Sequence, residues 1–169
     1  RLQHRPALEL IEHELETHPS NVDLHLQRSL VLDRSGRVGE AVRALRILMR
    51  ERPDDPVTMN ALGYTLVDHK QSLSEGEALI RRAIGLMPDS PAIQDSLGWA
   101  LFRRGKYAEA ATVLRKAYDQ AQDPEIAAHL GEALWLQGEK AQARDVWQEA
   151  LAGAPADPYL NSTLRRYAQ

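Results

Sequence analysis

The stretch Asp95–Leu101 reads DSLGWAL, and it decides the fold because it recurs along the chain. It is found again as NALGYTL at Asn60–Leu66 and as AHLGEAL at Ala128–Leu134. The three copies share a Leu-Gly-x-x-Leu core, and a degenerate copy at Gln27–Leu32 has Ser29 in the glycine position. Self-similarity at a fixed period is the sequence signature of a repeat protein, so the period has to be found before any single element is assigned.

Two small-residue positions mark the period, one in each half of the repeating unit. The first position recurs at spacings of 34, 35 and 33 residues, and the second, next to an acidic or amide residue, recurs at 35, 34 and 33. A small side chain at both positions allows two segments to approach closely. The marker residues of both kinds are Ser29, Ala41, Gly63, Gly76, Gly98, Ala110, Gly131 and Ala143.

The apolar spacing inside each unit is helical. Leucine, isoleucine and alanine recur every three or four residues on both sides of a short polar break, as on the buried face of a helix. Glycines at Gly36, Gly105 and Gly138 fall in these breaks and are suited to end a helix. Each unit is therefore predicted to be two antiparallel helices, and the chain to be all-α.

The markers and the prolines between units set the predicted boundaries over a single domain, 1–169. A second helix left over from an earlier unit is expected first, then four full units, then a capping helix. These segments are 5–18, 22–55, 56–90, 91–123, 124–157 and 158–168.

The units resemble tetratricopeptide repeats, whose period is about 34 residues. The resemblance covers nearly the whole chain and rests on the Leu-Gly-x-x-Leu core and the two small positions. It implies a right-handed α-solenoid in which the first helices of the pairs line a concave groove. Such a groove binds a protein or peptide segment.

Several function classes are excluded by composition and motifs. A formal net charge of −3, with arginine pairs dispersed among acids, argues against a nucleic-acid partner. The absence of cysteine excludes disulfides and cysteine-based metal sites. The apolar runs are far shorter than the roughly 18 residues of a membrane span.

No catalytic, cofactor or metal motif is recognised. His13 and His18 are five residues apart and so do not share a helix face, which makes a zinc-protease motif untenable. The sequence also has no phosphate-binding glycine loop and no nucleophile elbow. We therefore expect a protein that is not an enzyme and binds no cofactor.

The groove implied by the resemblance collects most of the aromatic residues of the middle units. Aromatic side chains anchor peptides because they bury a large area at a low cost in rotamer entropy. Ordinary packing between adjacent repeats is the alternative explanation, and Trp147, in a second helix, is expected to be such a core residue. The candidate groove residues are Asn60, Tyr64, Asp95, Trp99, Phe102, Arg103, His129, Glu132 and Trp135, with Tyr159 as an extension.

The stretch from Asn60 to Ala150 resembles more specifically the C-terminal repeats of Gram-negative outer-membrane tetratricopeptide lipoproteins. That resemblance implies a longer parent chain, lipid-anchored to the outer membrane and facing the periplasm. Some of these lipoproteins are adaptors that bring substrates to a periplasmic C-terminal processing protease. The first residue, Arg1, also fits a chain taken from a longer protein.

Two hypotheses for function remain open. The favoured one is a non-catalytic scaffold whose groove binds a protein segment, as an adaptor between a protease and its substrates. The alternative is an assembly module that uses the solenoid ends or the convex face. In the second case the first helix, which carries Leu8, Ile11 and Leu15, would promote self-association.

Overall fold

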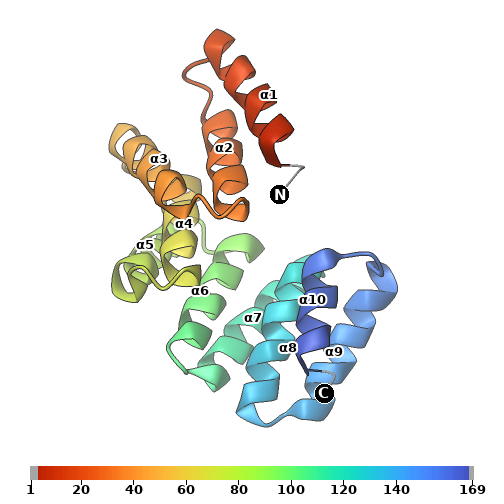
Figure 1. Ribbon diagram of the computed structural model, residues 1–169. Helices are drawn as coiled ribbons and strands as arrows, with labels where there is room; N and C mark the ends of the chain where they lie inside the picture. Colours follow the sequence, from red (N-terminus) through yellow and green to blue (C-terminus); the bar gives the residue numbers. More distant parts are fainter. Residues whose placement is uncertain (1–3, 168–169) are drawn as a thin grey trace. The chain divides into compact units, whose positions relative to one another are not determined.

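The computed structural model describes residues 4–167, all of whose regular structure is helical (Figure 1). The chain divides into two compact units, Arg1–Ala83 and Ile84–Gln169. Within each unit, consecutive helices run in opposite directions (Figure 1). The helices are α1 (His4–Thr17), α2 (Val22–Arg34), α3 (Val38–Glu51), α4 (Pro56–Asp68), α5 (Leu73–Leu86), α6 (Pro91–Arg103), α7 (Tyr107–Ala121), α8 (Pro124–Gln137), α9 (Lys140–Gly153) and α10 (Pro158–Tyr167).

The predicted all-α fold is confirmed, and each predicted full unit contains two helices. The predicted helix 5–18 corresponds to α1, and the predicted capping helix 158–168 corresponds to α10, with residue 168 outside the described residues. No helix within residues 4–167 is long and apolar enough to cross a membrane.

The helix ends follow from local sequence. Asp55 and Asp123 cap α4 and α8 through their carboxylates, each followed by a proline at the first helical position, where its missing N–H costs nothing. Gly36, Gly105 and Gly138 have φ angles of 83°, 78° and 103°, which glycine adopts without steric cost. The turns therefore lie where the sequence predicts the breaks.

The first unit has its core between α2, α3 and α4. Leu45 packs with Leu62 and Leu66, and a second cluster joins Leu8 of α1 to Leu32 and Ala41. Leu8 is therefore covered by its own chain.

The other apolar residues of α1 are more exposed to solvent than Leu8. Ile11 and Leu15 are half-buried, and Leu10, on another side of the helix, is 64% exposed. Self-association through α1 stays a prediction.

The glycines at the small-residue positions lie where the two helices of a pair pack closely. A Cβ added to Gly63 of α4 would lie 2.8 Å from the carbonyl oxygen of Gly76 in α5, and one added to Gly76 would lie 2.6 Å from that of Gly63. In this pair the two backbones themselves touch, so neither position accepts a side chain without separating the helices.

In the second unit, the glycine of the first helix packs against a side chain of the second helix and not against its backbone. A Cβ at Gly98 would meet Cγ of Leu114 at 2.4 Å, and a Cβ at Gly131 would meet Nε1 of Trp147 at 2.0 Å. A large side chain from the second helix therefore fills the space above each glycine. Trp147 is fully buried and donates a hydrogen bond to the Ala128 carbonyl oxygen at 3.4 Å, so it is a core residue as predicted.

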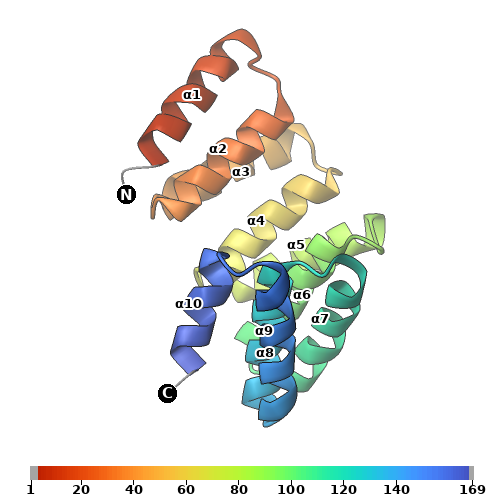
Figure 2. The ribbon, with the colours of Figure 1, turned by 90° about the vertical axis from the view of Figure 1, so that its right-hand side faces the viewer.

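The last helix, α10, packs against α8 and α9 (Figure 2). Leu160 and Thr163 are completely buried in this contact. Asp157 caps the helix by accepting a hydrogen bond from the Leu160 N–H at 2.7 Å. One face of α10 is thus part of the packed second unit.

The substitution Gly131→Ala should lower the free energy of unfolding by about 1–3 kcal/mol, because its methyl group has to displace the buried indole of Trp147. The matched control is Gly85→Ala within α5, where an added Cβ meets nothing within 4 Å. That change should raise stability by about 0.5–1 kcal/mol through helix propensity. Urea unfolding measures both values, and a Gly131→Ala protein as stable as the parent would contradict the close approach.

Candidate functional site

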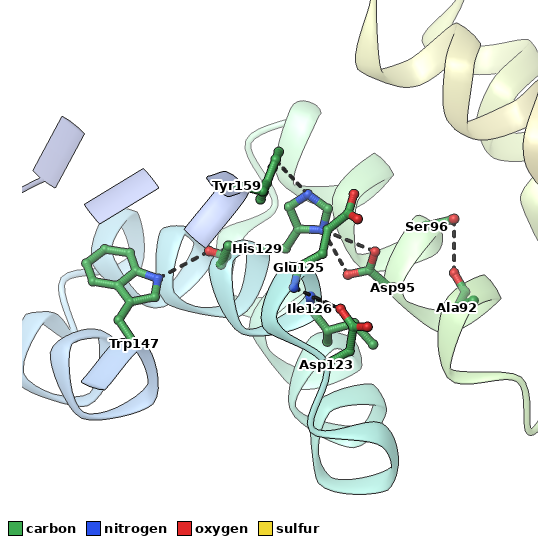
Figure 3. Close-up of polar contacts among 10 residues, drawn as sticks. Ala92, Asp95, Ser96, Asp123, Glu125, Ile126, His129, Trp147 and Tyr159 are labelled. Atoms are coloured by element: carbon green, nitrogen blue, oxygen red, sulfur yellow. Dashed lines mark hydrogen bonds and ion pairs between the residues drawn. The ribbon is translucent and has the colours of Figure 1, made fainter. Parts of the chain in front are cut away.

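A buried ion pair joins α6 and α8, two helices of the second unit that carry predicted groove residues. Nδ1 of His129 in α8 lies 2.9 and 3.1 Å from the two carboxylate oxygens of Asp95 in α6 (Figure 3). The His129 side chain is 0% exposed, and Asp95 is buried as well. Buried charges of this kind are tolerated only when they are paired and hydrogen-bonded.

Asp95 extends to higher pH the range over which the buried His129 stays protonated. Burial alone would lower the pKa of His129, but the charge and hydrogen bond of Asp95, with smaller contributions from Glu125 and Glu132, raise the pKa above its ordinary value. An imidazolium donates from both ring nitrogens. His129 can therefore serve Asp95 and a second acceptor at the same time.

That second acceptor comes from the last helix. The hydroxyl oxygen of Tyr159 in α10 lies 2.9 Å from Nε2 of His129, and the two rings meet edge to face (Figure 3). Asp95, His129 and Tyr159 thus link α6, α8 and α10 through one hydrogen-bonded chain.

Aromatic rings of α6 pack against these hydrogen-bonded side chains. Trp99 stacks on His129 with ring centroids 4.2 Å apart, and on Phe102 at 4.7 Å. The guanidinium of Arg103 lies 5.5 Å from the centroid of the Trp99 ring. Trp99 is only 4% exposed, so it acts here as a packing residue.

A second polar contact with α10 lies one turn further along α8. The Glu132 side chain is buried, and its Oε1 accepts a hydrogen bond from the Tyr167 hydroxyl at 3.2 Å and pairs with Arg166 at 3.0 Å. Burial raises the pKa of Glu132, against the lowering effect of the Arg166 charge. Burial and the neighbouring Glu132 carboxylate raise the pKa of Tyr167 to about 12.

The end of α10 also contacts two tryptophans. The Tyr167 ring lies 5.4 Å from the Trp135 ring and 5.3 Å from the Trp147 ring. Lys140 and Arg144 lie over Trp135 at 5.0 and 5.3 Å from its centroid. We define the α10-binding surface as the four side chains that meet α10 in these contacts, which are His129, Glu132, Trp135 and Trp147.

The first unit has a more open surface. Leu30 of α2 and Val57 of α4 are both 47% exposed. Val57 also lines a hollow of about 360 Å³. The hollow is lined by Ser20, Val22, Asp23, Leu26, Arg52, Asp55 and Val57.

The predicted groove residues divide between the two units. Asn60 and Tyr64 are half-buried on α4 in the first unit. The other candidates lie in the second unit, where Asp95, Trp99, His129 and Glu132 are buried and Phe102, Arg103 and Trp135 are half-buried. Their contact with a ligand stays a prediction, and three of them, His129, Glu132 and Trp135, contact α10.

Sequence reasoning missed the part that α10 plays. It described α10 only as a capping helix and assigned no contact to Arg166 or Tyr167, whereas both reach Glu132. The usable signal was the pair of tyrosines at positions 159 and 167, eight residues apart and thus near one face of a helix.

The described residues form no metal-binding cluster. Within residues 4–167 no three His, Asp or Glu side chains are grouped as metal ligands would be. Of the two histidines considered above, His13 pairs with Glu16 at 3.4 Å, and His18 lies 2.9 Å from the Thr17 hydroxyl. Both histidines therefore make local contacts with residues close to them in the sequence.

The family model for the tetratricopeptide repeat matches residues 60–125 and 96–158, which is more than half of the chain. The chain is 38% identical over 130 residues to the TPR repeat-containing protein PA4667 of Pseudomonas aeruginosa, covering 77% of this chain and 22% of that protein. It is 35% identical over 96 residues to human tetratricopeptide repeat protein 7A, covering 56% and 11%. The chain thus spans less than a quarter of either relative.

Solved structures agree on the fold. The thermophilic TPR protein TTC0263 of Thermus thermophilus matches with a TM-score of 0.85 at 22% identity, covering 98% of this chain and 89% of that one. The Cut9–Hcn1 hetero-tetramer of the APC/C matches with a TM-score of 0.80 at 19% identity, covering 95% and 31%. At these identities the likeness concerns the fold.

The stability of the second unit should fall as the pH rises from 6 to 9. The pKa of His129 is raised in the folded state, so its contribution is complete below about pH 6.5, the unfolded value, and is lost as the pH rises through the folded value. The raised pKa of Glu132 acts in the same direction, starting from about pH 4.5. Urea unfolding at pH 6 and 9, followed by tryptophan fluorescence, measures the difference.

Two variants assign this pH dependence. His129→Gln should reduce the difference between pH 6 and 9, and His13→Gln, at a largely exposed position on α1, should leave it unchanged. Equal pH dependence in the parent and in His129→Gln would refute the assignment.

Proposed function

Because the chain belongs to the tetratricopeptide repeat family, we propose that it is a non-catalytic scaffold that binds a segment of another protein. The tetratricopeptide fold supports protein–protein interaction and implies protein partners. The observation that locates the proposed site is a pair of exposed aliphatic side chains in the first unit. Val57 lines the hollow, and Leu30 lies one helical turn after Leu26, which also lines it.

The hollow of the first unit has a mixed polar and apolar lining. Its volume of about 360 Å³ lies within the 300–1,000 Å³ range of ligand pockets and accommodates one or two side chains. Leu26 and Val57 supply apolar surface, while Asp23 is exposed at the rim. An aliphatic side chain is the ligand chemistry that fits the apolar part of this lining, and Asp23 and Arg52 together give no preference for one sign of ligand charge.

The finer proposal is an adaptor that links a periplasmic C-terminal processing protease to its substrates. Its support is the resemblance of Asn60–Ala150 to the repeats of Gram-negative lipoproteins, together with the relative from Pseudomonas aeruginosa. Under this proposal the parent chain is lipid-anchored to the outer membrane and the repeats face the periplasm.

The alternative is an assembly module, and specific side chains favour it as a second candidate. Leu10 on α1 and Ile47 on α3, half or more exposed, are suited to contact a second copy or another subunit. The Cut9–Hcn1 hetero-tetramer shows this fold inside an assembly.

Partner capture followed by direct binding separates the two functions. Proteins captured from a Gram-negative envelope extract are identified by mass spectrometry, purified, and titrated against the parent and two variants. Leu30→Asp/Val57→Asp should weaken binding of a scaffold partner at least tenfold, because it places charge on the proposed contact surface. Ile47→Asp, with a similar exposure of 50% on α3, should leave binding within a factor of two.

The variants are chosen for their exposure. Substituting Trp99 would disturb the buried stack on His129 and confound binding with folding. Identical affinity of Leu30→Asp/Val57→Asp and the parent would reject the first-unit surface. Loss of binding or of self-association with Ile47→Asp alone would favour the assembly module.

A further inference from the structure

The α10-binding surface is polar where an ordinary repeat contact would be apolar. His129 and Glu132 present a histidine nitrogen and a carboxylate to α10, and Trp135 adds an aromatic face. A surface with fixed polar groups around an aromatic centre has the composition of a recognition site.

The fit between this surface and α10 is incomplete at Glu132. Oε1 takes both the Tyr167 hydroxyl and the Arg166 guanidinium, whereas Oε2 is buried and accepts no hydrogen bond from any residue within 4–167. A buried carboxylate oxygen without a donor is costly, and a guanidinium that reaches both oxygens is the strongest pairing available. A ligand that supplied such a pairing would be bound better at this point than α10 is.

The helix that covers the surface is not a member of the pairs α6–α7 and α8–α9. It has ten residues, follows the short turn Ala154–Asp157, and packs within the described residues only against α8 and α9. Isolated helices of this length are marginal in water, so α10 depends on its docking contacts.

We propose that the α10-binding surface is a second protein-binding site, which α10 occupies in place of a helical segment of a partner. The segment carries an arginine that pairs with both oxygens of Glu132 and a neighbouring aromatic residue that packs on Trp135. The proposal deepens the proposed scaffold function and rests on it.

The sequence of α10 gives the spacing of the partner segment. Its docked residues Tyr159, Leu160, Thr163, Arg166 and Tyr167 follow the positions i, i+1, i+4, i+7 and i+8 of a helix. An acidic residue at the position of Arg166 is disfavoured, because it would face the buried Glu132 carboxylate.

The test uses the full chain and a fluorescent peptide with the sequence of residues 156–167. In the parent, tethered α10 competes at an effective concentration on the order of millimolar, so the peptide should bind weakly. In the full-length variant Leu160→Asp/Thr163→Asp, whose two buried contacts are replaced by charges, the peptide should bind at least tenfold more tightly. The matched control Ser162→Asp/Arg165→Asp alters exposed positions of the same helix and should behave like the parent.

Peptide variants test the recognised chemistry. Arg166→Ala in the peptide should weaken binding to the released chain at least tenfold, whereas Arg165→Ala should change it less than twofold. Glu132→Gln in the released chain should remove the difference between these two peptides. No gain in binding on release, or equal losses for the two peptides, would overturn the proposal.

Further measurements distinguish a folding defect from a loss of binding. Helical circular dichroism shows whether α6–α9 persist in the released chain, and Arg166→Ala/Tyr167→Ala provides a milder release if they do not. Failure here with normal partner capture through Leu30 and Val57 would reject only the second site. Failure of that capture with successful peptide binding would reject only the first-unit surface.

Discussion

The close approach of two helices at a residue without a side chain is the contact on which the rest of the structure depends. At Gly63 and Gly76 the backbones of α4 and α5 meet, and at Gly131 the indole of Trp147 lies where a Cβ would be. These contacts fix the rotation of each helix about its axis, because only one face of the helix can come so near to its partner.

Fixing that rotation in α8 determines what its other faces present. With Gly131 turned toward α9, His129 and Glu132, three residues apart, share another face. That face meets Asp95 of α6 and the tyrosines of α10. The polar contacts of α8 with α6 and α10 thus follow from a packing constraint on the side of α8 that faces α9. These contacts include the surface that α10 covers.

The sequence was sufficient for the helix pairs and much less so for the surface. Small residues at a fixed period, proline after an aspartate cap and glycine in the turns each have one structural meaning, so the helices and their ends could be predicted. Periodicity does not tell what covers a helix that lacks a following partner. For that reason the contacts of α10 with His129 and Glu132 could not be predicted from the sequence.

Native-state amide hydrogen exchange of the full chain, resolved by peptide, tests most directly whether α10 is a removable cover. Exchange of the α10 amides through an opening much smaller than global unfolding, while α8 and α9 stay protected, is the predicted result. Exchange of α10 only together with α8 and α9 would show that it is an inseparable part of the last repeat, and would contradict a binding surface beneath it.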